Sequence, residues 1–222
     1  MSRLQLKPAC FMEPVTPATR THVIDRAKNM ITQPAKEWDV ISMETPNQSH
    51  IITGYVLVLA GAAAIAAFIG YGFIGFNSGF LGIRIAGVDW GIYQALAVLI
   101  GAVIGVYICA MVIDALAPSF DSEKNMGRSV QLVAYSYTPA WIGGLLAIYP
   151  PIAFVGALFG LYGLYIMYLG IPKLKKTSPD KQTGYFVVSI IAVIVVYLII
   201  GLIMSRLLMP AFGLSYSPAV QL

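Results

Sequence analysis

The chain has 222 residues, of which 58% are hydrophobic and only 11% are charged, about half the charge of an ordinary soluble domain. Its mean hydropathy is +0.77, and between Ile51 and Met111 the only charged residues are Arg84 and Asp89. Such uncharged stretches are long enough to cross a hydrocarbon core of about 30 Å as helices. The composition excludes a water-soluble fold, a disordered chain and a disulfide scaffold. It also excludes a nucleic-acid-binding domain, despite the net charge of +4.

The first 50 residues divide into two parts. Residues 1–19 contain three prolines and are predicted to be a flexible tail. In residues 20–50, apolar side chains recur at helical spacing from Val23 to Ile31, and Pro34 suits the first turn of a second short helix. We expect one or two amphipathic helices on the cytoplasmic side, which either lie on the membrane surface or pack against the protein's own loops.

Five apolar segments follow, each long enough to span a membrane as a helix. They are residues 51–76, 90–117, 130–149, 151–171 and 185–209, followed by a C-terminal tail of residues 210–222. The third and fourth segments are joined at Pro150 and Pro151. Because proline breaks helices, this pair predicts a tight hairpin between two spans. One kinked helix would be about 60 Å long, twice the thickness of a bilayer core.

The basic residues predict the orientation. Twelve of the 14 Lys and Arg fall in residues 1–50, 118–129 and 172–184, which five spans place on one side, and only Arg84 and Arg206 fall on the other. Positive residues mark the cytoplasmic side. We therefore expect an all-α integral membrane protein with five transmembrane helices, a cytoplasmic N-terminus and a periplasmic or lumenal C-terminus. The net charge of +4 is then explained by the basic residues on the cytoplasmic side.

Polar residues of the second and third spans form the first candidate site. Asp114 lies about one helical turn inside the cytoplasmic end of the second span, where a charge is costly and suggests a function. In the third span, Pro139 deprives the carbonyl of Tyr135 of its amide partner, so a neighbouring helix, a hydroxyl or water must satisfy that carbonyl. The candidate residues for a polar, ligand-binding cleft are Asp114, Arg128, Gln131, Tyr135, Ser136, Thr138 and Pro139.

Two interpretations of these polar residues stay open. Asp114 is either a helix-end carboxylate paired with Arg128 or Lys124, or a proton or cation site in a small transporter or channel component. The hydroxyls and amide of the third span either line a wet cleft or hold helices together.

A lysine-rich loop and a set of glycines complete the candidate sites. The lysines are Lys173, Lys175, Lys176 and Lys181, which are predicted to contact anionic lipid, with the acidic surface of a partner as the alternative. The glycines are Gly101, Gly105, Gly156, Gly160 and Gly163, which favour close helix packing within the chain or in a homodimer.

Residues that carry out catalysis are not evident. The only histidines, His22 and His50, lie outside the predicted spans, and the two cysteines are far apart in the sequence. There is no phosphate-binding loop of the GxxxxGK[ST] type. The sequence therefore predicts no catalytic residues, no metal site and no cofactor.

Three short segments resemble the prokaryotic type of the YIP (Ypt-interacting protein) family. They are MITQPAKEW at residues 30–38, AYSYTPAW at residues 134–141 and YIMYLG at residues 165–170. The resemblance covers about residues 25–210 and implies a five-span membrane domain with a cytoplasmic N-terminus, in agreement with the distribution of basic residues.

The resemblance also bears on function and partners. Eukaryotic members of the family are implicated in vesicle traffic through Rab-type GTPases and in membrane shaping. This chain has a short tail and lacks the Asp-Leu-Tyr-Gly-Pro motif of many such members, so Rab binding is not expected and a bacterial inner membrane is the expected location. The leading hypothesis is a non-enzymatic protein that organises lipids or protein partners, as a homo-oligomer or with another membrane protein, and binds lipid in the cytoplasm-facing cleft. The alternatives are the small transporter and an accessory subunit of a larger complex.

Overall fold

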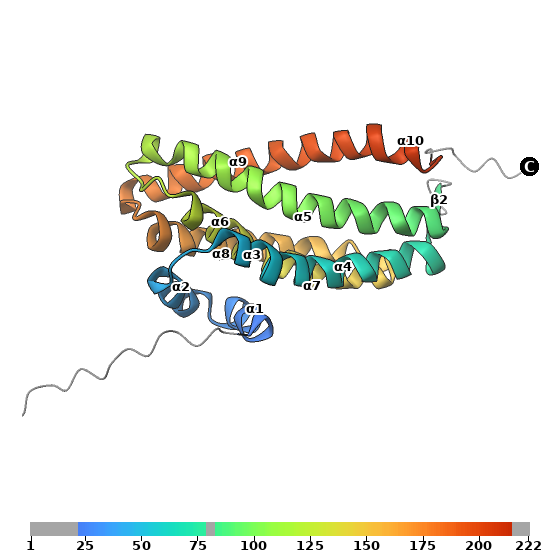
Figure 1. Cartoon of the computed structure of the whole chain (residues 1–222), viewed down its shortest axis with the longest axis horizontal. Helices are drawn as coiled ribbons and strands as arrows, with labels where there is room; N and C mark the ends of the chain where they lie inside the picture. The colour runs from blue at the N-terminus through green and yellow to red at the C-terminus, as the bar shows by residue number, and fades with distance from the viewer. Residues whose placement is uncertain (1–21, 79–82, 215–222) are drawn as a thin grey trace, which may run out of the picture.

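The computed structural model describes residues 22–78 and 83–214; the predicted tail 1–19 and the end of the predicted tail 210–222 lie outside the described residues. The protein is an all-α membrane protein whose long helices run side by side along one axis (Figure 1). Within the described residues, four helical stretches are long and apolar enough to span a membrane: Gln48–Ile74, Val88–Phe120, Val155–Lys175 and Pro179–Ala211. They correspond to the first, second, fourth and fifth predicted spans.

The first two spanning stretches are joined by a short β-hairpin. The first consists of α3 (Gln48–Ile51), a wide π-helical turn, α4 (Leu57–Ile69) and a second π-helical turn that ends at Ile74. Strands β1 (Phe76–Ser78) and β2 (Ile83–Ile85) then pair antiparallel, with Phe76 opposite Ile85. Gly75 and Gly87 flank the hairpin with φ of 77° and 128°, which glycine adopts readily. The second stretch is α5 (Val88–Leu116), extended by a 3₁₀ turn to Phe120.

The third predicted span is a broken helix. It consists of α6 (Met126–Ser136), α7 (Thr138–Gly144) and a 3₁₀ turn that ends at Ile148, with the break at Tyr137. Pro139 has no amide hydrogen and so cannot continue the hydrogen bonding of α6. The break agrees with the proline-broken helix expected from the sequence, and this segment is not one of the four long apolar stretches found among the described residues.

The rest of the bundle follows the predicted hairpin. A 3₁₀ turn over Pro150–Ile152 reverses the chain into α8 (Val155–Lys175). Then α9 (Pro179–Ile203) runs through a π-helical turn to α10 (Met209–Ala211).

Glycines let α8 lie directly on the broken helix. A Cβ atom at Gly156 would lie 2.7 Å from the carbonyl oxygen of Gly143, and one at Gly163 would lie 2.6 Å from the carbonyl oxygen of Ser136. Both distances are too short for any side chain, so the two backbones touch. Gly170 continues the same seven-residue spacing, and its neighbours are described below.

The other predicted packing glycines behave differently from one another. A Cβ at Gly105 on α5 would lie 2.7 Å from the hydroxyl of Tyr197 on α9, so this glycine allows close contact between two helices. At Gly101 and Gly160 a Cβ would meet no heavy atom within 4 Å. These two glycines therefore do not permit a close approach of neighbouring helices.

Two short helices lie beside one end of the bundle (Figure 1). They are α1 (Val23–Thr32) and α2 (Pro34–Met43), and Pro34 occupies the first turn of α2. Met30, Trp38 and Ile41 are completely buried and belong to the main hydrophobic core. The structure thus packs the amphipathic helices against the protein, as one of the two expectations had it, but against helices α6, α7 and α8 and not against loops.

Candidate functional site

A buried ion pair lies where α5, α6 and α8 meet. Lys175 Nζ lies 2.7 Å from Asp114 Oδ1 and donates to Ser129 Oγ at 2.8 Å. The Ser129 hydroxyl and the backbone N–H of Asn125 also donate to Asp114 Oδ1, at 2.9 and 2.8 Å. The Lys175 side chain is completely buried and that of Asp114 is 9% exposed. Asp114 is therefore paired with Lys175, and not with Arg128 or Lys124 as the sequence led us to expect.

This ion pair holds the start of α6 in place. The side chain of Asn125 caps α6 by accepting the N–H of Arg128 at 3.1 Å, while the Asn125 N–H binds Asp114. A carboxylate beside a helix N-terminus is also favoured by the helix dipole. The pair ties three helix ends together, because Asp114 lies near the end of α5, Asn125 directly before α6 and Lys175 at the end of α8. Removing either charged partner would leave a buried charge without compensation.

Arg128 binds the end of α2. Its guanidinium donates from Nη1 to the carbonyl oxygen of Ile41 at 2.9 Å and from Nη2 to that of Ser42 at 2.8 Å. It also donates to Gln131 Oε1 at 3.0 Å. The last carbonyls of a helix lack internal donors, so a cation there satisfies them and complements the helix dipole. Arg128 therefore attaches α2 to α6, and its hydrogen bonds, including that to Gln131, are made within the protein.

Trp38 is seated between α6 and α8. Its indole N–H donates to the carbonyl oxygen of Ile166 at 2.9 Å, and its ring lies edge-on to that of Tyr135, with 6.3 Å between centroids. A Cβ at Gly170 would lie 2.7 Å from Trp38 Cε2 and 2.7 Å from Leu132 Cδ1. Residues from all three segments that carry the family resemblance therefore meet around one indole ring.

The carbonyl freed by Pro139 is satisfied by a hydroxyl. Thr138 Oγ1 donates to the carbonyl oxygen of Tyr135 at 2.7 Å and lies 2.7 Å from the hydroxyl of Tyr55 on the first spanning stretch. The rings of Tyr55 and Tyr135 are in edge contact, with 4.8 Å between centroids. These groups hold the broken helix to its neighbour. Ser136 is also buried, and its Oγ has no hydrogen-bond partner within the described part of the chain.

Arg26 of α1 completes the contact between the N-terminal helices and the bundle. Arg26 Nη1 lies 2.9 Å from Glu37 Oε1, Nη2 pairs with Glu44, and the guanidinium carbon is 5.4 Å from the centroid of the Tyr135 ring. Burial by itself lowers the pKa of Arg26, but the hydrogen bond to Glu44 and the charges of both carboxylates outweigh burial and raise the pKa. Arg26 therefore stays charged and cross-links α1 to α2.

The four lysines that were predicted to contact anionic lipid do not all lie at the surface. Lys173, Lys176 and Lys181 are exposed and pair with Asp39, Glu123 and Asp121, respectively. Lys175 is buried in the ion pair with Asp114 and cannot face lipid in this structure. Exposed ion pairs of this kind contribute little stability and are readily exchanged.

Several contacts of this region are not predicted by the sequence. Trp38 and Gly170 lie in the motifs quoted above, but their contact was not foreseen. The roles of Tyr55 and Lys175 have no local signal in the sequence, because each depends on a partner far along the chain. The polar groups bind one another, so the arrangement is suited to holding helices in position.

Comparison with known proteins identifies the family. A family model described as the Yip1 domain matches residues 28–203. The chain belongs to the Yip1 family. It is 32% identical over 161 residues to "Inner membrane protein YohC" of Escherichia coli strain K12, in an alignment that covers 70% of this chain and 82% of that protein. The protein of the same name from Escherichia coli O6:H1 strain CFT073 gives the same values. No solved structure matches.

The family assignment confirms the resemblance and the location expected from the sequence. The Yip1 match begins within α1 and ends with α9, so it includes Trp38, the broken helix and both partners of the buried ion pair. Together with the spanning helices and the inner-membrane relatives, it makes this Yip1 protein an integral protein of the bacterial inner membrane.

Proposed function

We propose that this Yip1 protein is a non-enzymatic membrane protein that organises lipids and protein partners at the cytoplasmic face of the inner membrane. The observation that carries this proposal is the attachment of α1 and α2 to the bundle by Arg128, Trp38 and Arg26. The attached helices leave Ile24 and Met43 each 79% exposed, and α2 lies beside the lysine-rich end of the bundle, which carries Lys173, Lys176 and Lys181, because its Asp39 pairs with Lys173. An apolar and basic surface of this kind suits the interface of an anionic leaflet.

The proposal includes a topology of five spans with the N-terminus in the cytoplasm. Ser122 Oγ lies 2.7 Å from Thr177 Oγ1, and the Glu123 N–H donates to the Lys175 carbonyl at 2.8 Å. The loop after α5 therefore meets the loop after α8 at one end of the bundle. Because α8 begins at the other end, the segment α6–α7 runs the length of α8 to connect them. From Met126 to Ile148 that segment is about 35 Å long, enough to cross the hydrocarbon core.

The lipid partner is tested with the three exposed lysines. Lys173, Lys176 and Lys181 would be changed together to Gln, and retained phosphatidylglycerol would be compared with retained phosphatidylcholine by native mass spectrometry from mixed nanodiscs. We expect the variant to lose its preference for phosphatidylglycerol, since each basic residue near an anionic surface contributes about 1 kcal/mol.

A matched control removes the same ion pairs from the other side. Changing Asp39, Asp121 and Glu123 to Asn, Asn and Gln breaks the three pairs and leaves the lysines free for lipid. This variant should retain more phosphatidylglycerol than the parent protein. Equal retention by all three proteins would remove anionic lipid from the proposal.

The protein partner is a second copy of this chain or another membrane protein docked on the exposed side of α1 and α2. Replacing Met43 with Cys, in a protein whose native cysteines are changed to Ser or Ala, allows cross-linking in intact membranes. A cross-linked dimer or a reproducible larger adduct is the expected result. Monomer alone would count against this part of the proposal.

The transporter alternative gains no support from the site geometry. The carboxylate of Asp114 is bound by Lys175, Ser129 and the Asn125 N–H, and the polar face of α6 and α7 is covered by α1, α2 and Tyr55. We therefore do not propose transport.

A further inference from the structure

A cavity that opens to the surface lies between α4, α5, α7 and α9, away from the ion pair of Asp114 and Lys175. It has a volume of about 420 Å³ and is lined by residues of α4, α5, α7 and α9, a size within the range of small-molecule sites. Much of its wall is made of small residues, among them Ala97, Gly101, Ala140 and Gly201, with Trp141 and Tyr197 adding aromatic surface.

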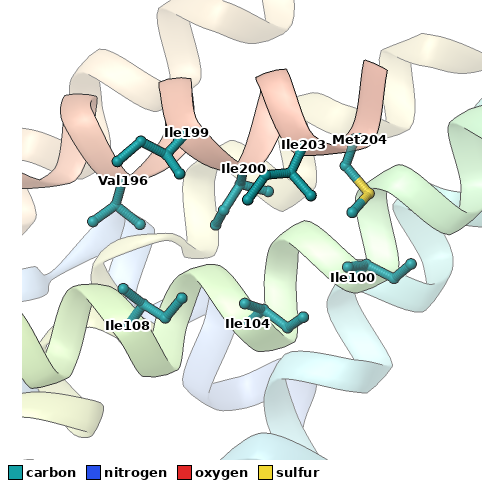
Figure 2. Close-up of a pocket in the computed structure, with 8 residues that line it drawn as sticks. All are labelled: Ile100, Ile104, Ile108, Val196, Ile199, Ile200, Ile203 and Met204. Atoms are coloured by element: carbon teal, nitrogen blue, oxygen red, sulfur yellow. The ribbon is translucent and has the colours of Figure 1, made fainter. Parts of the chain in front are cut away.

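The cavity has an apolar neighbour at the surface. A second hollow, of about 160 Å³, lies between α5 and α9, where isoleucines of the two helices face each other (Figure 2). Ile200 and Met204 line both spaces, so the two are adjacent. At the rim, Ile104 and Ile199 are 45% and 51% exposed. The outer surface of α5 and α9 beside the cavity is therefore apolar.

The lipid that surrounds α5 and α9 indicates which kind of molecule enters the hollow. Both α5 and α9 belong to spanning stretches of an inner-membrane protein, so the rim of the hollow is continuous with the lipid-facing surface. Water does not enter such an apolar space readily, and unfilled walls forgo dispersion contacts. We propose that the groove between α5 and α9 admits an acyl chain of a membrane lipid, which extends into the cavity and contacts Trp141.

Gly101 and Gly201 line the cavity at positions that have room for a side chain. Gly101 is buried, yet a Cβ there would meet no heavy atom within 4 Å. Gly201 is exposed, and a Cβ there would also meet no heavy atom within 4 Å. A larger side chain at either position can therefore occupy the cavity without forcing helices apart. Gly61 on α4 offers equal space for a Cβ and is not among the residues that line the cavity, so it serves as the matched control position.

The test uses tryptophan quenching by brominated lipid. In a Trp90→Phe background the remaining tryptophans are Trp38 and Trp141, of which Trp38 is completely buried between α2 and the bundle. The protein is reconstituted into phosphatidylcholine vesicles whose acyl chains are either brominated or unmodified. Trp141 emission should fall in the brominated vesicles, although the residue is only 7% exposed. Gly101→Leu should abolish this loss of emission, and Gly61→Leu should leave it unchanged.

Gly201→Leu changes a different wall of the cavity. It should also abolish the loss of Trp141 emission, so the test does not depend on the folding of one variant. An undiminished loss of emission in both cavity variants, or no loss in the parent protein, would overturn the proposal. Because phosphatidylcholine carries no net charge, a failure here is distinct from a failure of the lysine surface to bind anionic lipid.

Discussion

The indole N–H of Trp38 on α2 donates to the carbonyl oxygen of Ile166 on α8, 128 residues further along the chain. This bond lies at the centre of the contact between the N-terminal helices and the membrane-spanning bundle. The ring is completely buried, and α2 is additionally held through two of its last carbonyls by Arg128. The N-terminal helices are thus an integral part of the folded domain.

Replacing Trp38 with Phe keeps most of the buried aromatic surface and removes the donor. We expect the free energy of unfolding to fall by about 0.5–1.5 kcal/mol, the net value of one hydrogen bond. Denaturant unfolding in detergent measures this loss. Hydrogen exchange should also become faster in α2 and stay unchanged in α9. Unaltered exchange in α2 would contradict the role given to this bond.

Gly170→Ala tests the space beneath the indole ring. The added methyl group would lie 2.7 Å from both Trp38 and Leu132, so one of them must move, at a cost of about 1–3 kcal/mol. Gly160→Ala is the control on the same helix, because a Cβ there meets nothing within 4 Å. Glycine costs helix stability relative to alanine, so the control should be neutral or stabilising by thermal melting. Equal melting temperatures for both variants would show that Trp38 does not need the glycine.

The Asp114–Lys175 pair is suited to a double-mutant cycle. Asp114→Asn and Lys175→Met each leave a buried partner without its counter-charge and should cost about 3–5 kcal/mol. The double variant should be less destabilised than the sum of the two single variants, because no uncompensated charge remains. Additive losses in denaturant unfolding would mean that the two charges do not interact.

Thr138→Val and Tyr55→Phe separate the two hydrogen bonds beside the helix break. Thr138→Val leaves the Tyr135 carbonyl without its hydroxyl donor and should cost about 1–3 kcal/mol. Tyr55→Phe keeps that donor in place and should cost less, about 0.6 kcal/mol, as is usual for bonds between membrane helices. Unfolding free energies in the same detergent give the comparison, and the opposite ranking would be inconsistent with the observed geometry.

The sequence predicted the membrane part well because long apolar runs and proline act locally. The Pro150–Pro151 hairpin and the need of the Tyr135 carbonyl for a new partner follow from the missing N–H of proline, and a hydroxyl, one of the three expected kinds of partner, fills that need. A break near Pro139 was expected for the same reason, whereas its position at Tyr137 was not, because an averaged run of apolar residues does not reveal at which residue backbone hydrogen bonding stops.

The candidate site was harder to predict because its partners are distant in sequence. Lys175 stands among other lysines, and nothing local marks it as the one that is buried against Asp114, 61 residues earlier. Arg128 binds backbone carbonyls of α2, which have no signature in a sequence. Gly101 was read as a packing glycine, and only its empty surroundings indicate a cavity wall.

The central claim is that the broken helix α6–α7 crosses the membrane and that the lysine-rich end faces the cytoplasm. It is tested most directly with a membrane-impermeant maleimide on single-cysteine variants at Tyr149, which is 48% exposed at the hairpin, and at Ser178, between α8 and α9. The account predicts labelling of Tyr149→Cys in intact cells, and labelling of Ser178→Cys only after permeabilisation. Labelling of both positions from the same side, or the reverse pattern, would contradict it.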